Sequence, residues 1–380
     1  MTVYLDNSAT TRPSEPVRKK VLQAMESGWF NPSALYKPAM EIQKEMEGVR
    51  ERLLEAAGAG GQTVLFTSGG TEADNLALLG FAKGKRNPGR VLISSVEHPA
   101  VSACREPLEA LGFRVAEIPA GASGTVDLEK LERMMDGQVD LIAVMQVNNE
   151  SGAVEPLERI AQMRSRLCPQ ARLHVDGVQG FLRVPVCFNR LGLDSYALSA
   201  HKIHGLKGTG ALILRKGSRI RPLLYGGGQE GNLRSGTENT FGILALGEAV
   251  RTWDGAAADR MARLRTRLAE RLRALIPETV FNSPAEGCAP HILNAAFPPV
   301  RSQTMLLALE GEGVYVSAGS ACASRKQKIS PVLRAMGVRQ EIADCSLRFS
   351  LCPDNTEAEI DYAAEKTAAL YGTLKKYTRR

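Results

Sequence analysis

The fold is decided by the stretch Thr63-Val64-Leu65-Phe66-Thr67-Ser68-Gly69-Gly70-Thr71-Glu72-Ala73-Asp74-Asn75. A β-prone run at 63–67 leads through two glycines into an amphipathic helix predicted over 71–84. Glycine lets backbone N–H groups approach an anion, and the start of a helix adds partial positive charge. The spacing matches neither a Walker loop nor a dinucleotide-binding turn. The stretch predicts a phosphate cradle after a strand, with an ordinary capped turn as the alternative.

The same alternation of strand and helix continues from about residue 60 to residue 215. Helical patterns over 100–112 and 157–167 separate short apolar runs, which lie at 63–67, 91–95, 141–147, 173–176, 195–199 and 211–215. This alternation is typical of an α/β fold with a mostly parallel sheet and helices on its faces. Ligands of such sheets bind beyond the carboxyl ends of the strands. The residues that follow each run are therefore the candidate site residues.

The pattern changes beyond about residue 255 and indicates a second domain. A basic helix is predicted over 258–275, and mixed strands and helices follow it. The last helix begins with the capping box Thr356-x-x-Glu359. We predict a large domain over residues 15–255 and a smaller α+β domain formed by residues 1–14 with 256–380.

Composition excludes several classes of protein. The chain has 380 residues, a formal net charge of +7 and 7 cysteines, which are scattered and form no Cys-x-x-Cys pair. This cysteine usage argues against a disulfide framework and a structural zinc site, and it fits a reducing cytoplasm. No signal peptide or apolar run of transmembrane length is recognised, so we expect no membrane partner. The mild basicity permits an acidic partner without requiring one, and we expect no direct contact with nucleic acid.

An acid and a lysine follow two further strand runs. Asp176 ends the run at 173–176, and Lys202 follows the run at 195–199. A lysine amine here can condense with a cofactor aldehyde, while the acid holds a pyridine nitrogen protonated so that the ring accepts electrons. Helix capping and a solvated lysine are the alternatives. Because the cradle, the acid and the lysine lie in order on successive strand ends, the cofactor site is favoured. The pair His201-x-x-His204 lacks the third ligand of a metal site.

Arg348 lies in Ser346–Leu351, where leucine and phenylalanine alternate with polar residues. The alternation predicts a strand with Arg348 on the face opposite the core. An arginine among serines suits bidentate capture of a carboxylate. The alternative is an exposed arginine on an edge strand.

Cys322 lies in Val316–Ser324, a run of small residues that cannot build a core and predicts an exposed loop. Arg325, Lys326 and Lys328 follow at once, and positive charge favours the thiolate. A functional thiol is one interpretation of the segment, and a Gly-Ser turn that contains a cysteine is the other.

Together these residues resemble the cysteine desulfurases of the class V aminotransferase group, and within them the group I enzymes with a long cysteine loop, here at about 314–330. The similarity runs almost end to end. It includes the segments 4–11, 31–33, 97–98, 147–150, 234–237 and 346–351. The combination of motifs is specific, although no single motif is.

The resemblance implies a homodimer of fold type I, whose large domain has a mostly parallel sheet of the seven-stranded type. It also implies that the enzyme uses pyridoxal 5'-phosphate to take sulfur from L-cysteine. In that family Lys202 would hold the cofactor, Asp176 would pair with its ring nitrogen and His98 would stack on the ring. Arg348, with Asn31, would bind the substrate carboxylate. Asn149 and Gln179 would orient the ring, with Gln179 near its phenolic oxygen. Gly70, Thr71, Ser199 and His201 would hold the phosphate. Thr237 would reach across from the partner subunit.

The resemblance also implies that Cys322 attacks the sulfur of the bound cysteine, which leaves alanine and a persulfide on Cys322. An iron–sulfur scaffold, a tRNA-thiolating enzyme or a thiamine-pathway carrier would then accept the sulfur. No metal is required, although Cys322 could ligate a transient iron–sulfur cluster. Selenocysteine lyase, class V aminotransferase and an inactive scaffold homologue are the alternatives. Cys322 within its Gly-Ser-Ala context disfavours an aminotransferase, and the context of the cysteine loop disfavours a selenocysteine lyase. The presence of Lys202, Cys322 and Arg348 disfavours an inactive scaffold.

Three departures from the family pattern are visible. Ala200 replaces the usual glycine, Leu206 replaces the usual proline, and the basic segment 325–328 replaces the residues usual after the cysteine. We expect a small effect of the first on the phosphate site. The basic segment bears on the choice of sulfur acceptor.

Overall fold

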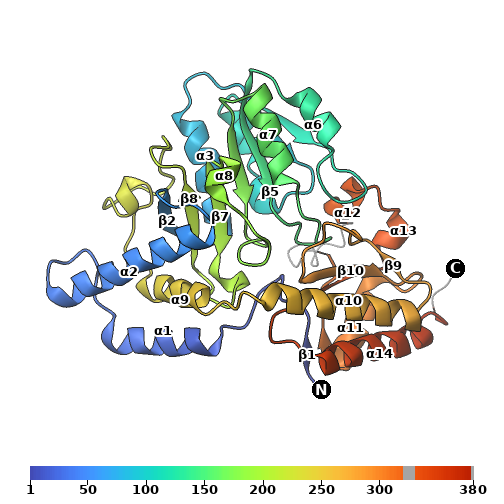
Figure 1. Ribbon diagram of the computed structural model, residues 1–380. Coiled ribbons are helices and arrows are strands. Elements are labelled where there is room, and N and C mark those ends of the chain that lie inside the picture. Colours follow the sequence, from blue (N-terminus) through green and yellow to red (C-terminus); the bar gives the residue numbers. More distant parts are fainter. Residues whose placement is uncertain (320–329, 378–380) are drawn as a thin grey trace.

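The computed structural model describes residues 1–319 and 330–377 (Figure 1). Its centre is a seven-stranded sheet in which the strand β8 (Gly210–Leu214) is antiparallel to its two neighbours. The other strands all run parallel to one another. The order is β2 (Thr63–Thr67), β8, β7 (Ser195–Ser199), β6 (Arg172–Asp176), β5 (Val139–Met145), β3 (Arg90–Ser94) and β4 (Arg114–Ile118). The predicted mostly parallel α/β sheet is confirmed.

Alternating side chains of each strand build a core on both faces of this sheet. In β2, Val64 and Phe66 pack into one core, and Leu65 packs into the other. The first core includes residues of α1 (Glu15–Ser27), α2 (Lys37–Ala56), α6 (Leu128–Met134), α7 (Leu157–Leu167), α8 (Phe188–Leu191) and α9 (Thr240–Arg251). The second includes residues of α3 (Gly70–Gly84), α4 (Pro99–Ser102) and α5 (Arg105–Ala110). Helices thus cover both faces.

The helix predicted over 100–112 is two short helices, α4 and α5. The break has a local cause. Pro107 has no N–H group, so it cannot donate to the carbonyl of Ala103, as a continuous helix would require.

The second, smaller assembly has its own core, in which Val3 and Leu5 meet residues beyond 260. An antiparallel sheet has the order β12 (Ser346–Ser350), β10 (Ile292–Ala296) and β9 (Val280–Phe281). β1 (Val3–Tyr4) pairs with β11 (Val314–Tyr315). The helices are α10 (Ala257–Leu275), α11 (Ser302–Gly311), α12 (Pro331–Ala335), α13 (Gln340–Ala343) and α14 (Glu357–Leu374). The capping box of Thr356 and Glu359 at the start of α14 is confirmed.

The domain boundaries at residues 15 and 255 stay a prediction. The three largest cores support them, since one holds Val3 and Leu5 with residues 264–371, and the two on the faces of the large sheet lie within residues 17–249. Two smaller clusters join the two sides. Figure 1 shows α10 and α14 side by side beneath this second sheet, and the N-terminus close to α14.

The glycine-rich loop after residue 225 is held against the large sheet by a buried ion pair. Glu230, with 2% of its side chain exposed, pairs with Arg50 at 2.7 Å. The same carboxylate accepts a hydrogen bond from the backbone N–H of Phe66 in β2. Arg234, in the same loop, pairs with Glu72 of α3 at 2.8 Å. The loop is therefore fixed at two points beside the start of α3.

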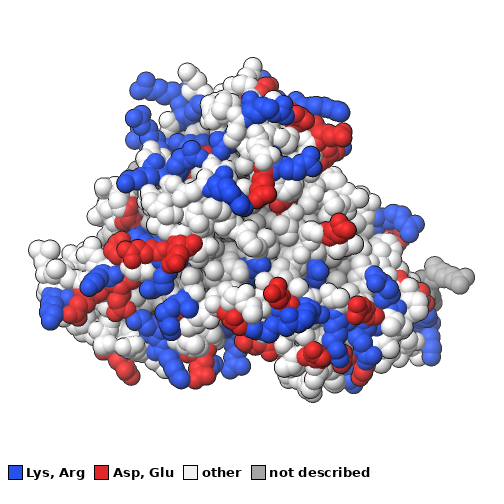
Figure 2. Space-filling model, in the orientation of Figure 1, with Lys and Arg blue, Asp and Glu red and all other residues white. Residues whose placement is uncertain are grey.

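On the face that Figure 2 shows, lysine and arginine are interspersed with aspartate and glutamate. No helix among the described residues is long and apolar enough to cross a membrane.

The Glu230→Gln variant should lose about 3 kcal/mol of unfolding free energy, because Arg50 would be left charged and largely buried without its buried counter-ion. The more exposed Glu47 would be the carboxylate that still pairs with it. Equilibrium denaturation in urea measures this loss. The matched control is Glu158→Gln, whose pair with Arg190 is mostly exposed and should contribute at most about 1 kcal/mol. Equal effects of the two substitutions would contradict the assignment of Glu230 as the anchor of the loop.

Candidate active site

A cavity of about 240 Å³ lies beyond the carboxyl ends of the parallel strands. It is lined by Ser8, Ala9, Gly70, Thr71, Asp74, His98, Ala100, Met145, Val147, Asn149, Asp176, Val178, Gln179, Ser199, His201, Lys202 and Arg348. Most of the side chains proposed from the sequence are therefore together. They come from α3, from residues at or just after the ends of β3, β5, β6 and β7, and from the middle of β12.

Lys202 sits in a short 3-10 turn, Ala200–Lys202, directly after β7. Its Nζ donates to the carbonyl oxygens of Ser8, at 2.5 Å, and Ala9, at 2.9 Å. Burial, together with the charges of Arg348 and Arg183, lowers the pKa of this amine from its ordinary 10.5 to about 7. A substantial fraction is thus neutral and nucleophilic at physiological pH.

Asp176 ends β6 and accepts a hydrogen bond from the N–H of Val178 at 2.9 Å. Burial raises its pKa, and His98, the Val178 N–H and Lys202 oppose that rise. His98 caps α4, where its Nδ1 accepts from the N–H of Ala100 at 3.1 Å. Burial lowers the pKa of His98. The ring is therefore the neutral tautomer with its proton on Nε2.

The phosphate cradle predicted at the start of α3 lines this cavity through Gly70 and Thr71. The first N–H groups of a helix have no acceptor within the helix, so they are available to an anion. A Cβ added at Gly70 would lie 2.5 Å from Cγ2 of Val178, which explains the glycine. Across the cradle, the Nδ1 of His201 is 3.1 Å from the hydroxyl of Thr10. Burial and nearby cations lower the pKa of His201 to about 4, so its ring is neutral.

The N-terminal segment joins the two halves of the cavity. Gln179 donates from Nε2 to the carbonyl of Ser8 at 2.9 Å, and its Oε1 lies 3.3 Å from Nε2 of the buried His291. Sequence reasoning gave no role to Ser8, Ala9 or His291. Ser8 and Ala9 act through backbone carbonyls, which carry no residue-type signal. The one sequence signal for Ser8 and Ala9 was that both lie in the segment 4–11, which is part of the family resemblance.

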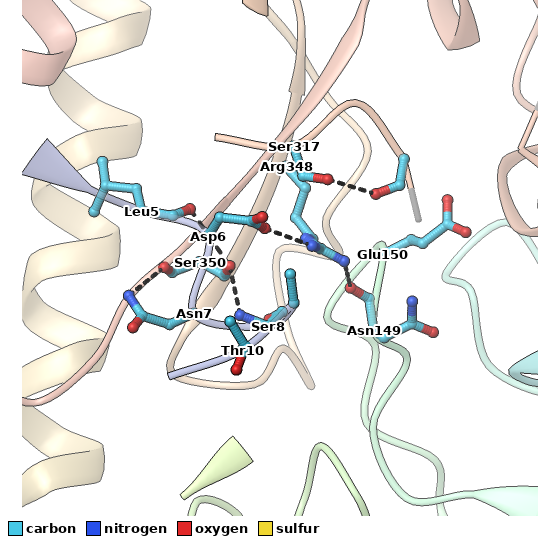
Figure 3. Close-up of polar contacts among 12 residues, drawn as sticks. Leu5, Asp6, Asn7, Ser8, Thr10, Asn149, Glu150, Ser317, Arg348 and Ser350 are labelled. Carbon is cyan, nitrogen blue, oxygen red and sulfur yellow. Dashed lines mark hydrogen bonds and ion pairs between the residues drawn. The ribbon is translucent and has the colours of Figure 1, made fainter. Parts of the chain in front are cut away.

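Arg348 is 1% exposed, so the exposed-edge interpretation is wrong. One terminal nitrogen donates to Oδ1 of Asp6 at 2.7 Å, and the other donates to the carbonyl of Asn149 at 2.8 Å (Figure 3). Its Nε has no partner within the described part of the chain. The two contacts fix the plane of the guanidinium while its remaining N–H groups stay available to a carboxylate.

Two proposed residues do not line the cavity. Asn31 is exposed, and its Oδ1 accepts from the N–H of Ser33. Thr237 is exposed on the loop that Glu230 anchors. Cys322 and the basic segment 325–328 lie outside the described residues. On the N-terminal side of this segment, Ser317 is joined to Arg348 by backbone hydrogen bonds in both directions, and its hydroxyl donates to the carbonyl of Gly319 at 3.3 Å.

The departures at 200 and 206 contact the interior of the protein. Ala200 is fully buried in the first core, and Leu206 packs against that core. Neither residue lines the cavity. Among the described residues, no group of three or more His, Cys, Asp or Glu side chains could hold a metal ion.

The family assignment follows from comparison with known proteins. A family model for class-V aminotransferases matches residues 3–363. The chain belongs to that family. It is 39% identical over 382 residues to cysteine desulfurase IscS of Methanosarcina thermophila, an alignment that covers 98% of this chain and 93% of that protein. It is 37% identical over 371 residues to cysteine desulfurase IscS of Dictyoglomus turgidum, covering 96% and 93%.

The fold of this class-V family member also matches a solved structure described as a NifS-like protein. The TM-score is 0.92 at 34% identity, and the match covers 98% of this chain and 100% of the other. The resemblance to the cysteine desulfurases and the predicted fold class are thereby confirmed, and the chain is an enzyme of a pyridoxal-phosphate-dependent family.

The cavity of this family member fits pyridoxal phosphate. An unusually acidic lysine, a buried carboxylate and a helix N-terminus line one space, and they match an aldehyde, a pyridine nitrogen and a phosphate. The glycine at position 70 keeps the phosphate end open, as the clash of an added Cβ shows.

The cofactor-free protein should react at Lys202 with an amine-directed aldehyde and a reductant, with an apparent pKa near 7. Below this pH the amine is protonated and unreactive, and above it the neutral amine attacks. Peptide mapping of the labelled protein over a pH series measures the rate, and Lys202→Arg identifies the peptide. A midpoint near the ordinary 10.5 would contradict the buried, cation-flanked setting.

Proposed function

We propose that the chain is a cysteine desulfurase that takes sulfur from L-cysteine, releases L-alanine and keeps the sulfur as a persulfide on Cys322. The observation that carries the proposal is the meeting of Lys202, Asp176 and Arg348 in one cavity. These three groups suit a cofactor aldehyde, a pyridine nitrogen and an amino-acid carboxylate. The curated relatives named above, aligned over nearly the whole chain, bear the name cysteine desulfurase.

Pyridoxal phosphate, when bound, would supply the electron-accepting heterocycle that makes the substrate's Cβ–S bond labile. Lys202 would hold it covalently, Asp176 would bind its ring nitrogen and His98 would cover the ring. Further contacts would come from Asn149 and Gln179 at the ring and from Gly70, Thr71, Ser199 and His201 at the phosphate. His98 and His201 are neutral. In this proposal both therefore offer hydrogen bonds to the cofactor and add no positive charge to its site.

Arg348 would bind the substrate carboxylate through the N–H groups that Asp6 and Asn149 leave available. The neutral amine of Lys202 would take and return the proton of the substrate's α-carbon. The role proposed for Asn31 in carboxylate binding stays a prediction.

Cys322 would attack the sulfur of the bound cysteine as a thiolate. An S–S bond forms while the Cβ–S bond breaks, and the carbon takes a proton to become the methyl group of alanine. The described residues beside the segment 320–329 support this placement. Ser317 is paired with Arg348, and the hydroxyl of Ser330 donates to Glu150 at 2.5 Å, next to Asn149 of the cavity.

The sulfur acceptor in this proposal is a protein of sulfur or iron–sulfur metabolism: an iron–sulfur scaffold, a tRNA-thiolating enzyme or a thiamine-pathway carrier. A cytoplasmic location fits any of them, and so does the basic segment 325–328. A transient iron–sulfur cluster on Cys322 remains part of the proposal. A selenocysteine lyase, a class V aminotransferase and an inactive scaffold are the alternatives that product analysis separates.

We also propose a homodimer in which Thr237 reaches the partner's cavity. Large apolar side chains are exposed along α1, α2 and their connection: Leu22, Met25, Trp29, Leu35, Tyr36 and Met40. An apolar patch of this kind favours burial against another protein surface. Thr237 is exposed on a loop that two ion pairs hold in place. A fixed, exposed loop suits a contact with a second subunit.

Purified protein should bind pyridoxal phosphate with visible absorption, and Lys202→Ala should lose that absorption. Cys322→Ser should keep the absorption and lose alanine and sulfide formation from L-cysteine, because the acceptor of the sulfur is gone. Absorption spectra and product assays measure both effects. A colourless wild type that stays colourless with added cofactor would overturn the proposal, and full activity of Cys322→Ser would assign the nucleophile to another cysteine.

In light scattering the molar mass should be about twice the 41.0 kDa of one chain. Leu35→Asp should shift the mass toward the monomer, because a carboxylate would be buried in the proposed interface. Leu307→Asp, at another exposed leucine, on α11, is the control and should leave the mass unchanged. A monomeric wild type would contradict the proposed dimer.

A further inference from the structure

One acid of the cavity has no role in the proposed reaction. Asp74, in the first turns of α3, is 1% exposed and lines the same cavity as Asp176. Its Oδ2 is buried and has no hydrogen-bond partner among residues 1–319 and 330–377. A buried carboxyl oxygen without a partner is destabilising, so its presence beside a binding cavity needs an explanation.

The other oxygen of Asp74 belongs to a buried hydrogen-bonded chain. Oδ1 of Asp74 is 3.1 Å from Nε2 of His174, and Nδ1 of His174 is 2.8 Å from the hydroxyl of Ser195. His174 lies on β6 and Ser195 on β7, where the two residues are paired in register. Both are at most 5% exposed. The chain runs from α3 across two central strands and ends at a residue that can donate or accept.

The protonation states of this chain follow from its burial. Burial lowers the pKa of His174 to about 3, so the imidazole is neutral and carries one N–H. Burial first, and then the charges of Asp176 and Glu97, raises the pKa of Asp74 well above its ordinary value. The thiol of Cys104, which also faces Asp74, has a pKa raised to about 12 and is neutral. Burial and these two neighbouring acids therefore favour the protonated form of Asp74.

The position of that proton is set by the hydrogen bonds. When Ser195 donates to Nδ1, the Nε2–H of His174 donates to Oδ1, and the acid proton lies on Oδ2. In the opposite arrangement Oδ2 would be a second buried acceptor beside the anionic Asp176, with no donor. The first arrangement gives Oδ2 a proton to donate, so it is favoured.

Glu97 is a second buried acid near Asp176. Glu97 accepts the N–H of Met145 at 2.6 Å, and Met145 is the register partner of Asp176 in the neighbouring strand. Burial, and then the charge of Asp176, raises the pKa of Glu97 well above its usual value. Asp176 itself faces His98 and Lys202, which favour its ionised form, and Tyr196, whose pKa is raised. Asp176 is thus the most acidic member of the set.

We propose that Asp74, held by His174 and Ser195, is a positioning residue that donates a hydrogen bond toward Asp176 and keeps the single negative charge of the three acids on Asp176. The inference rests on the proposed function for the identity of the ring nitrogen that this charge binds. The buried chain itself is independent of it. A neutral donor beside Asp176 stabilises the carboxylate without adding the repulsion of a second anion.

The substitutions Asp74→Asn and Asp74→Ala test the proposal. Asparagine keeps the shape and the donor of a protonated aspartate, whereas alanine removes both. Asp74→Asn should bind pyridoxal phosphate within about threefold of wild type. Asp74→Ala should bind it about tenfold or more weakly, since one hydrogen bond to a charged group is lost. Equilibrium dialysis of the cofactor-free full chain measures both constants. Equal weakening by the two substitutions would show that Asp74 acts as an anion, and three equal affinities would show that it positions nothing. Either result overturns the proposal.

Infrared spectroscopy of the same proteins without cofactor gives a second readout that does not depend on the proposed function. The difference between wild type and Asp74→Asn at neutral pH should contain the carbonyl band of a protonated carboxyl group. A carboxylate band in its place would overturn the proposal. The control is Glu155→Gln, at a buried acid with a pKa raised to about 8 outside the cavity lining. It should lose a protonated-carboxyl band without changing cofactor affinity. If the wild type binds no cofactor, the proposed function fails while the infrared result still decides the state of Asp74.

Discussion

The site depends on the hydrogen bonds of one short segment, residues 5–11, which runs between the two sheets. Its backbone exchanges hydrogen bonds with Ser350 of β12 on one side, and its Thr11 N–H donates to His201 on the other. Between these points its carbonyls accept from Lys202 and Gln179. The amine of Lys202 and the buried guanidinium of Arg348 are thereby held in one cavity. The segment offers the backbone acceptors and the Asp6 carboxylate that such an arrangement requires.

Burial determines which of the titratable groups are charged. The cavity gathers Lys202 and Arg348 with Asp176, and it excludes water from most of their surroundings. The three histidines at 98, 174 and 201 are kept neutral, and burial raises the pKa values of Asp74 and Glu97. Few groups of the cavity can therefore carry a charge. Each of them suits a distinct part of an amino-acid substrate or its cofactor. This selection follows from desolvation, because each further buried charge would need its own counter-ion.

Several predictions from sequence depended on local chemistry and agree with the structure. Gly69-Gly70 after a β-prone run sets a strand, a turn and a helix start by steric rules alone. Thr356 and Glu359 form their capping box within four residues. Arg348 was harder to interpret. Its alternation with Leu347 and Phe349 predicted the strand and the face, but not its burial, because Ser317, Asp6 and Asn149 cover it from three distant parts of the chain.

The sequence by itself determined the α/β alternation, the strand ends that carry the acid and the lysine, and the family that the chain resembles. Each of these follows from the periodicity of apolar residues or from a contiguous motif. The tertiary structure alone decided the environment of those residues. The pKa of Lys202, the chain from Asp74 to Ser195 and the ion pair of Arg348 with Asp6 join residues up to 342 positions apart. Such contacts depend on how strands are ordered in the sheet and on what covers them, and no local pattern encodes either.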